Sequence, residues 1–250
     1  MSECFIIPIY NHHQTIGSTV AALQPFKLPV VIVDDGSDLI TRQTLQQLAQ
    51  QYDSITLVTL PHNSGKGAAV MAGMQHAWAA GFTHAIQVDA DGQHNLQDIP
   101  QLRQLSAQYP QALISGAPVY DDSIPTGRKI GRYITHFWVW VETLSFSVRD
   151  TMCGFRVYPL ASCIHLMQQV QLGTRMDFDI EIMVRLYWQG VQIHFIPTKV
   201  IYPQGGCSHF KALYDNWLIS KMHTVLFFGM LKRLPQLLSH KQRRTNVAAD

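Results

Sequence analysis

Two aspartates, Asp89 and Asp91, carry the strongest chemical signal in this sequence. They stand two residues apart, directly after the mostly apolar run 85–88, which predicts a buried parallel strand. In an open α/β sheet, ligands bind outside the carboxyl ends of such strands. Two carboxylates at that place can bind a divalent cation, and the cation can neutralise a diphosphate. Asp and Gly are also ordinary turn formers, so this run alone leaves a metal site and a simple turn open.

Two further polar clusters follow apolar runs. Asp35 comes after the run 30–33, where a carboxylate can accept hydrogen bonds from a nucleotide base or ribose. A turn followed by a helix cap explains the same residue. Lys66 opens a helix after the loop 60–65, and backbone amides at a helix start suit a phosphate, with Lys66 adding positive charge. The alternative is a glycine-rich loop needed only for its backbone shape.

The elements that must position these clusters alternate in type. Alternating strands and helices imply βαβ units and a mostly parallel sheet, which would bring the three clusters to one edge. Strands are predicted at 4–9, 30–33, 55–60, 84–88 and 112–115, and helices at 14–23, 41–51, 66–80 and 96–109. The second half predicts a polar loop at 121–127, an aromatic-rich helix at 129–148, a loop entering a strand at 149–158, a helix at 177–188, an extended segment at 191–201 and an amphipathic stretch at 214–238.

Composition narrows the class of protein. The chain has 250 residues, of which 47% are hydrophobic and 14% charged, so it is globular and not disordered. A formal net charge of +2 is too small to indicate a nucleic-acid partner. The four cysteines show no Cys-x-x-Cys pair, which disfavours zinc and a disulfide framework and fits a reducing cytosol. We expect neither a signal peptide nor a membrane span. The absence of G-x-G-x-x-G and Walker A spacing disfavours those nucleotide sites.

The order of these motifs resembles an inverting glycosyltransferase of family 2 with the GT-A fold. The later motifs resemble the branch that transfers mannose or glucose to polyprenyl (dolichol) phosphate. The resemblance covers about residues 4–210. Its motifs are Pro8-Ile9-Tyr10-Asn11, Val33-Asp34-Asp35-Gly36-Ser37, Asn63-x-Gly65-Lys66-Gly67, Asp89-Ala90-Asp91, Ser115-Gly116, Arg128, Arg132, Asp150-Thr151-Met152-Cys153-Gly154-Phe155-Arg156, Phe178-x-x-Glu181 and Gly206-x-Ser208-x-Phe210.

This resemblance implies a role for each matching residue. The nucleotide sugar would be bound by Pro8, Tyr10, Asn11, Asp35, Asn63, Lys66, Asp89 and Asp91. Mg²⁺ or Mn²⁺ and the donor diphosphate would be held by Asp89, Asp91 and Gln93. The acceptor would meet Arg128, Arg132, Gly154, Phe155, Arg156 and Ser208. His12 stands where the family usually has Glu, which leaves the choice between UDP and GDP sugars open, and His209 stands where the branch often has Lys.

The catalytic residues implied in this way are Asp91, Arg128 and one carboxylate of the helix start at 177–181. A hydroxyl acceptor must lose its proton to a base, whereas a phosphate acceptor is already an anion. Asp177 and Glu181 share one helical face and Asp179 points elsewhere. Our candidate base is Asp179 or Glu181. Acidic residues also favour the first turn of any helix, which remains an alternative explanation.

The stretch 214–238 is amphipathic with basic residues nearby. Such a helix can lie in a membrane interface, or it can pack on the domain or in a dimer contact. A basic flank and a lipid-linked acceptor favour the membrane. We therefore expect a GT-A domain at 1–212, an amphipathic helical extension at 213–240 and a basic, disordered tail at 241–250. The protein would work in the cytoplasm, peripheral to the inner membrane's cytoplasmic face.

Two other functions stay open. A sugar nucleotidyltransferase also combines a nucleotide-binding fold with acidic metal ligands, but it starts with a Gly-rich loop and a basic residue that the segment 8–11 does not offer. An inactive nucleotide-sugar-binding scaffold is the second alternative. Intact Asp89, Asp91 and Lys66 argue against it.

Overall fold

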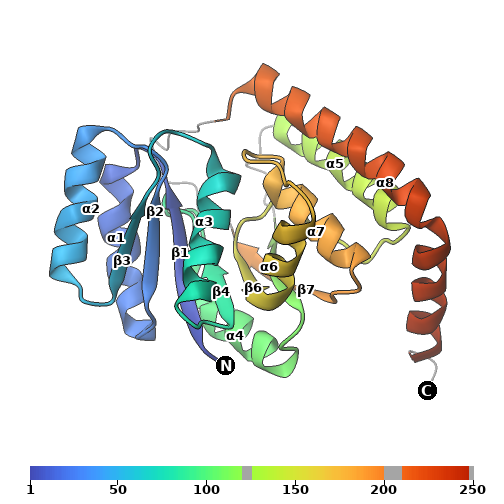
Figure 1. Ribbon diagram of the computed structural model, residues 1–250, viewed down its shortest axis with the longest axis horizontal. Coiled ribbons are helices and arrows are strands. Elements are labelled where there is room, and N and C mark those ends of the chain that lie inside the picture. Colours follow the sequence, from blue (N-terminus) through green and yellow to red (C-terminus); the bar gives the residue numbers. More distant parts are fainter. Residues whose placement is uncertain (120–125, 200–209, 248–250) are drawn as a thin grey trace.

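The computed structural model describes residues 1–119, 126–199 and 210–247, with the side chains of 126–129 and 240–247 left out (Figure 1). Its centre is one seven-stranded sheet in the order β3-β2-β1-β4-β6-β5-β7. β6 runs antiparallel to both of its neighbours and the other pairs are parallel. The strands are β1 (Glu3–Ile9), β2 (Val30–Asp34), β3 (Ile55–Thr59), β4 (His84–Gln87), β5 (Leu113–Val119), β6 (Arg156–Pro159) and β7 (Ile193–Lys199).

Helices cover both faces of this sheet, which explains why its central strands are apolar throughout. Successive residues of β1 face opposite cores: Phe5 and Ile7 pack with α1, α2 and α4, and Ile6 packs on the side of α3, α6 and α7. These helices are α1 (His13–Leu23), α2 (Leu39–Gln51), α3 (Lys66–Ala79), α4 (Ile99–Gln108), α6 (Leu160–Gln169) and α7 (Phe178–Trp188). The predicted mostly parallel sheet with flanking helices is confirmed.

The register of the first strands aligns their carboxyl ends. Asp34 at the end of β2 lies opposite Ile9 of β1 and Thr59 of β3. The loops that follow β1, β2 and β3 therefore leave the sheet at one level, as the alternating pattern predicts, and β4 adds the segment beginning at Val88 beside them.

The second half departs from the sequence-based expectations in three places. The helix α6 was not predicted at all, whereas the predicted loop entering a strand at 149–158 agrees with β6. The aromatic-rich helix α5 (Thr126–Thr143) ends before residue 148, because Leu144 takes a left-handed φ of 51° and the Ser145 N–H bonds back to the Trp140 carbonyl. The amphipathic helix α8 (Ala212–Val247) continues into the tail that we expected to be disordered from residue 241.

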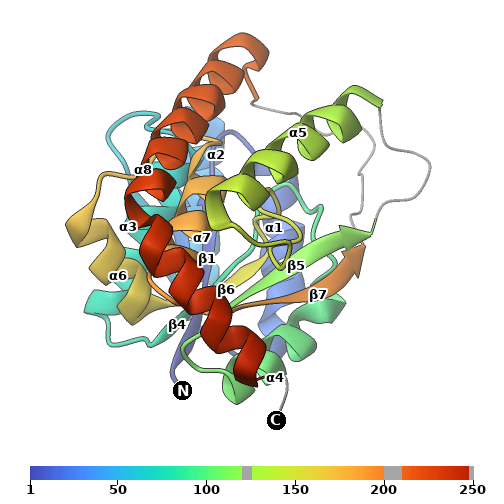
Figure 2. The same ribbon diagram turned by 90° about the vertical axis from the view of Figure 1, so that its right-hand side faces the viewer.

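Helices α5 and α8 lie side by side at one end of the molecule (Figures 1 and 2). Between them, the buried Glu142 carboxylate accepts a hydrogen bond from His223 Nδ1 at 2.8 Å. Trp188 of α7 donates to the Glu142 carbonyl, which ties this helix pair to the domain. Among the residues that the structure describes, none of the helices combines the length and the apolar character needed to cross a membrane.

Candidate active site

A lysine and two carboxylates form the centre of the candidate site. Lys66, the first residue of α3, places its Nζ 2.9 Å from Asp89 Oδ2 and 3.1 Å from Asp179 Oδ2. Asp89 follows β4, and Asp179 lies in the first turn of α7, so three separate elements meet at this point. The ammonium group is therefore shared between one carboxylate of the Asp-x-Asp motif and one of the acidic helix start.

The electrostatics of this cluster favour its charged form. Burial by itself would raise the pKa of Asp89, but the Lys66 ammonium outweighs it and holds that pKa well below its usual range. Burial would likewise lower the pKa of Lys66, and the carboxylates of Asp179 and Asp89 raise it above its usual value instead. Both partners thus remain ionised at neutral pH.

Gly154 gives this cluster its space. A Cβ atom at residue 154 would lie 2.8 Å from Lys66 Nζ, 2.9 Å from Asp89 Oδ2 and 2.6 Å from Gln87 Nε2. No side chain fits there without displacing one of these polar atoms. The position that the family resemblance assigned to the acceptor side therefore also shapes the ion cluster.

Buried polar groups behind the cluster hold it in place. Gln87 Nε2 donates to Asp89 Oδ1 at 2.9 Å, and Gln87 Oε1 accepts a hydrogen bond from the Tyr158 hydroxyl at 3.0 Å. Arg156 is fully buried, and its guanidinium donates to the carbonyls of Thr151, Cys153 and Asp179 at 2.7 Å each. These bonds join the loop before β6 to the first turn of α7. Arg156, which the resemblance assigned to the acceptor, is thus buried behind the cluster.

His94 supports Asp89 from the other side. The Asp89 N–H donates to His94 Nδ1 at 3.2 Å, so the ring proton sits on Nε2, which lies 3.6 Å from Asp89 Oδ2. The ring stacks on Phe155 at 4.8 Å between centroids. Burial lowers the pKa of His94, although the neighbouring carboxylates act in the opposite direction. His94 is thus a neutral support for the motif.

The donor loop, defined here as residues 63–67, is fixed by Asp35. The backbone N–H groups of Ser64 and Gly65 donate to the two Asp35 carboxylate oxygens at 2.7 and 2.9 Å. We expected the backbone N–H groups at the start of this helix to bind a phosphate. The Ala68 N–H instead donates to the Thr174 carbonyl at 3.0 Å. The amino end of α3 is therefore partly covered by protein.

The acidic helix start divides as its spacing predicts. Glu181 accepts hydrogen bonds from the Gly173 N–H and from Arg185, both at 2.7 Å, and Asp177 accepts one from the Arg175 N–H. Asp179 alone faces Lys66. Of the two candidate bases, Asp179 is the one that the fold places in the cluster.

Asp91 and Gln93 lie on the turn after Asp89, where the Gln93 N–H donates to Asp91 Oδ1 at 3.0 Å. Within the described part of the chain, no three His, Cys, Asp or Glu side chains gather into a metal site. Mg²⁺ is commonly held by one or two carboxylates together with substrate phosphates, so Asp89 and Asp91 suit a cation that arrives with a diphosphate. Such a cation would share Asp89 with Lys66 and Gln87, which leaves Asp91 as the less encumbered ligand.

The other predicted site residues have different surroundings. Pro8 is buried in β1, Tyr10 and Asn11 are half-buried, and Asn63 is exposed. The Asn11 amide oxygen accepts the Asp38 N–H at 2.7 Å, which braces the loop after β1 against the start of α2. Arg132 forms an ion pair with Asp150 at 2.6 Å and so supports the loop that carries Gly154. The side chain of Arg128 and all of Ser208 lie outside the described residues.

A family model described as Glycosyl transferase family 2 matches residues 4–167. The chain belongs to this glycosyltransferase family. The family and the GT-A-like fold that we predicted are thereby confirmed. The chain is 29% identical over 202 residues to a dolichyl-phosphate beta-glucosyltransferase of Trichomonas vaginalis, and this match covers 72% of the chain and 60% of the relative. The chain thus spans less than two thirds of that relative's length.

Two more distant proteins widen the comparison. The chain is 25% identical over 245 residues to a UDP-N-acetylglucosamine–dolichyl-phosphate N-acetylglucosaminyltransferase of Methanococcus voltae. This match covers 88% of the chain and 96% of the relative. The fold of the chain matches a glucosyl-3-phosphoglycerate synthase from Mycobacterium tuberculosis, crystallised with Mn²⁺, UDP-glucose and phosphoglyceric acid, with a TM-score of 0.64 at 14% identity. This match covers 92% of the present chain and 79% of the synthase, and it supports the fold alone.

The residues that support the ion cluster were not predicted from the sequence. Gln87 and Tyr158 are ordinary strand residues by composition, and only the pairing of β4 with β6 brings them together. The alternation of Arg156 and Tyr158 on one face of a strand was the available signal. Arg175 was also missed, because its partner Asp215 is 40 residues away in the sequence.

Proposed function

We propose that this protein transfers a sugar, with inversion, from a UDP or GDP sugar to a lipid-linked or polyprenyl-phosphate acceptor at a membrane surface. The observation that carries the proposal is the Lys66–Asp89–Asp179 cluster at the carboxyl edge of the sheet, with Asp91 on the next turn. Its charges match a diphosphate leaving group with its cation. The relatives from Trichomonas vaginalis and Methanococcus voltae are named as transferases to dolichyl phosphate, and they support the acceptor class.

In this mechanism the protein's own groups hold and orient the donor. A bound Mg²⁺ or Mn²⁺, held by Asp89, Asp91 and Gln93 together with the diphosphate, would supply Lewis-acid stabilisation of the leaving group. Lys66 adds a positive charge to the same region. The hydrogen bonds that Asp35 accepts from Ser64 and Gly65 hold the donor loop against the sheet. Gln87 and Tyr158 keep Asp89 aimed at this point.

The surroundings of Asp179 favour a phosphate acceptor over a hydroxyl. Its Oδ2 is paired with Lys66, and its side chain is only 6% exposed. An acceptor hydroxyl would have to compete with Lys66 for this oxygen, whereas a phosphate oxygen needs no deprotonation before it attacks the anomeric carbon. Asp179 would then serve to orient Lys66, and the base that we sought from the sequence is not needed.

The exposed faces of α5 and α8 support action at a membrane. On α5, the exposed large apolar residues recur at helical spacing while polar Thr135 and Glu142 are buried, which is the reverse of a surface helix in water. The exposed apolar residues are Ile130, Tyr133, Ile134, Phe137 and Trp138 on α5, and Leu213, Tyr214, Trp217, Val225, Phe228, Leu231 and Leu238 on α8. Lys221 and Lys232 lie among them, as expected for a helix at an anionic lipid interface.

A panel of nucleotide sugars tests the donor. We expect one of UDP-, GDP-, CMP- or dTDP-sugars to raise the melting temperature only when Mn²⁺ is present, because a ligand that binds only the native state stabilises it by mass action. The measurement is thermal unfolding with each sugar, with and without Mn²⁺. The matching free sugar without nucleotide is the control and should give no rise. If no nucleotide sugar raises the melting temperature of folded protein, the proposed transfer from a nucleotide sugar fails.

Vesicle flotation tests the membrane face. Replacing Trp217 and Phe228 by Ser should weaken binding to vesicles that contain anionic lipid by about tenfold or more, because two aromatic side chains would no longer leave water. Trp78, which is 45% exposed on α3, gives the matched control, and Trp78→Ser should bind like the wild type. Equal binding by the double variant, or dimer formation that the double variant abolishes, would assign this face to protein contacts instead.

A further inference from the structure

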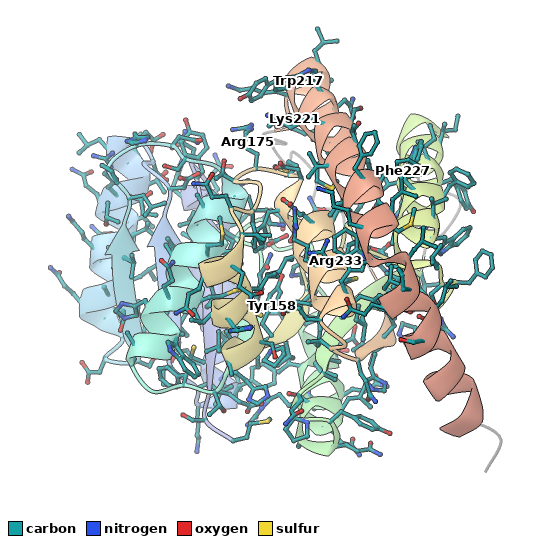
Figure 3. All side chains as sticks on the ribbon, turned by 45° about the vertical axis from the view of Figure 1, so that its right-hand side comes forward. Tyr158, Arg175, Trp217, Lys221, Phe227 and Arg233 are labelled. Carbon is teal, nitrogen blue, oxygen red and sulfur yellow. The ribbon has the colours of Figure 1, made fainter. Side chains whose placement is uncertain are left out.

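Arg175 and Asp215 form a clasp that the proposed chemistry does not use. Arg175 lies on the loop before α7 (Figure 3). Asp215 lies in the first turn of α8. The guanidinium donates from Nε to Asp215 Oδ1 at 2.7 Å and from Nη2 to Oδ2 at 3.4 Å. Asp215 is fully buried, and its Oδ2 also accepts the Lys211 N–H at 2.7 Å. Such a bidentate, partly buried pair has one defined geometry.

The other side of Arg175 touches the donor loop. A Cβ atom on Gly65 would lie 2.7 Å from Arg175 Cγ and closer still to the Thr174 carbonyl oxygen. Gly65 has a φ of 102°, a conformation that residues with a side chain rarely adopt. The absence of a side chain also lets segment 174–175 approach its backbone. Because Ala68 also donates to the Thr174 carbonyl, segment 174–175 forms one wall of the loop.

The clasp therefore lies between the donor loop and α8. On one side Asp35 holds the Ser64 and Gly65 amides, and on the other side segment 174–175 closes over Gly65. That segment is joined to α8 through Asp215. The ring of Tyr214 lies 5.6 Å from the Arg175 guanidinium and adds a cation–π contact from the same turn of α8.

We propose that Arg175, held by Asp215 on α8, is a positioning residue that sets the conformation of the donor loop and with it the affinity for the nucleotide sugar. The inference rests on the proposed function, because it takes residues 63–67 as part of the donor site. It makes α8 a component of that site as well as a membrane-facing element. Leu213, Tyr214 and Trp217, which belong to the proposed membrane face, are exposed on the same turns of α8 as Asp215.

A purely structural role for the clasp predicts a different result. Loss of a structural ion pair would lower the melting temperature and leave the KM for the donor unchanged in the folded protein. A positioning role raises that KM and leaves kcat nearly unchanged, because Asp89 and Asp91, the proposed cation ligands, lie outside the donor loop. The split between KM and kcat therefore separates the two roles.

The experiment compares Arg175→Gln, Arg175→Lys and Asp215→Asn with the wild type in the full chain. Glu3→Gln is the matched control, because it breaks an ion pair of similar geometry. Arg103 Nε lies 2.7 Å from Glu3 Oε2, and the Glu3 carboxylate is buried. This pair links β1 to α4, away from the donor loop. Amide hydrogen exchange of residues 64–68 is measured without ligand, and KM and kcat are measured with the donor found in the nucleotide panel.

We expect faster exchange at 64–68 and a donor KM raised about three- to tenfold in Arg175→Gln and Asp215→Asn, the size expected for the loss of one hydrogen bond of ordinary strength. Arg175→Lys should recover part of the loss, and Glu3→Gln should change neither quantity. Unchanged exchange and unchanged KM in the folded variants would overturn the inference while the proposed function stands. A wild type that binds no nucleotide sugar would overturn both.

Discussion

Replacing Asp91 by Asn should lower sugar transfer at least about 100-fold, because the cation that neutralises the diphosphate loses a charged ligand. The fold should be unaffected. Asp91 is partly exposed, and an Asn side chain can still accept the Gln93 N–H that Asp91 Oδ1 accepts now. Turnover is measured with the donor identified in the nucleotide panel, and Mn²⁺ binding is measured in the presence of the nucleotide diphosphate.

Asp53→Asn is the matched control for this variant. Asp53 is exposed and precedes β3, at the opposite edge of the sheet from the site, so its loss should leave turnover unchanged. An Asp91→Asn enzyme with wild-type turnover and wild-type Mn²⁺ binding would remove the Asp-x-Asp motif from the mechanism. The remaining cation in the site would then be Lys66, and the proposed metal dependence would fail.

Replacing Lys66 by Met should lower the free energy of unfolding by about 3–5 kcal/mol, the cost of removing one partner from a buried ion pair. The side chain is 19% exposed and touches two carboxylates, so its loss leaves Asp89 and Asp179 facing each other without a cation between them. Urea denaturation measures the change. Lys27→Met, which changes an exposed lysine, should stay within about 0.5 kcal/mol of the wild type.

The pH dependence of this loss has a definite sign. In the wild type, the pKa of Asp89 is lowered, so its contribution to stability is present above its ordinary pKa and disappears as the pH falls through the lowered value. Without Lys66, two neighbouring carboxylates raise the pKa of one of them, so the variant is penalised most at neutral pH. The difference between wild type and variant should therefore shrink from about pH 7 to about pH 4.

A second variant separates charge repulsion from lost packing. Lys66→Met combined with Asp179→Asn removes the repulsion and keeps the Asp179 carbonyl that accepts from Arg156. It should regain much of the stability lost in Lys66→Met. If the double variant is no more stable than the single one, the destabilisation comes from packing at the start of α3 and the cluster is not held by its charges.

The helix pair α5 and α8 changes how the molecule divides. We expected a catalytic domain followed by a separate amphipathic extension from residue 213, and this boundary remains a proposal. The structure packs α8 on α5 and α7, with Leu226 and Met230 in the same core as Ile182 and Val184 of α7. The His223–Glu142 bond and the Arg175–Asp215 clasp add polar links to that packing. The stability of α8 is therefore coupled to that of the domain.

Local chemistry in the sequence determined the βαβ alternation and the edge where polar residues gather. An apolar run predicts a buried strand, and the turn formers that follow it at Asp35 or Asp89 predict where the strand ends. Both signals lie within a few residues of one another, so they can be read from the sequence. The helical spacing also separated Asp179 from Asp177 and Glu181 correctly, because the 3.6-residue period depends on nothing outside the helix.

Only the tertiary structure decided what these residues contact. Lys66, Asp89 and Asp179 come from elements spread over more than a hundred residues, and their meeting depends on the packing of α3 and α7 against one sheet face. The same holds for Thr174 closing the start of α3 and for Asp215 holding Arg175. Contacts between distant residues leave no local pattern, because each partner alone has the composition of an ordinary loop or helix.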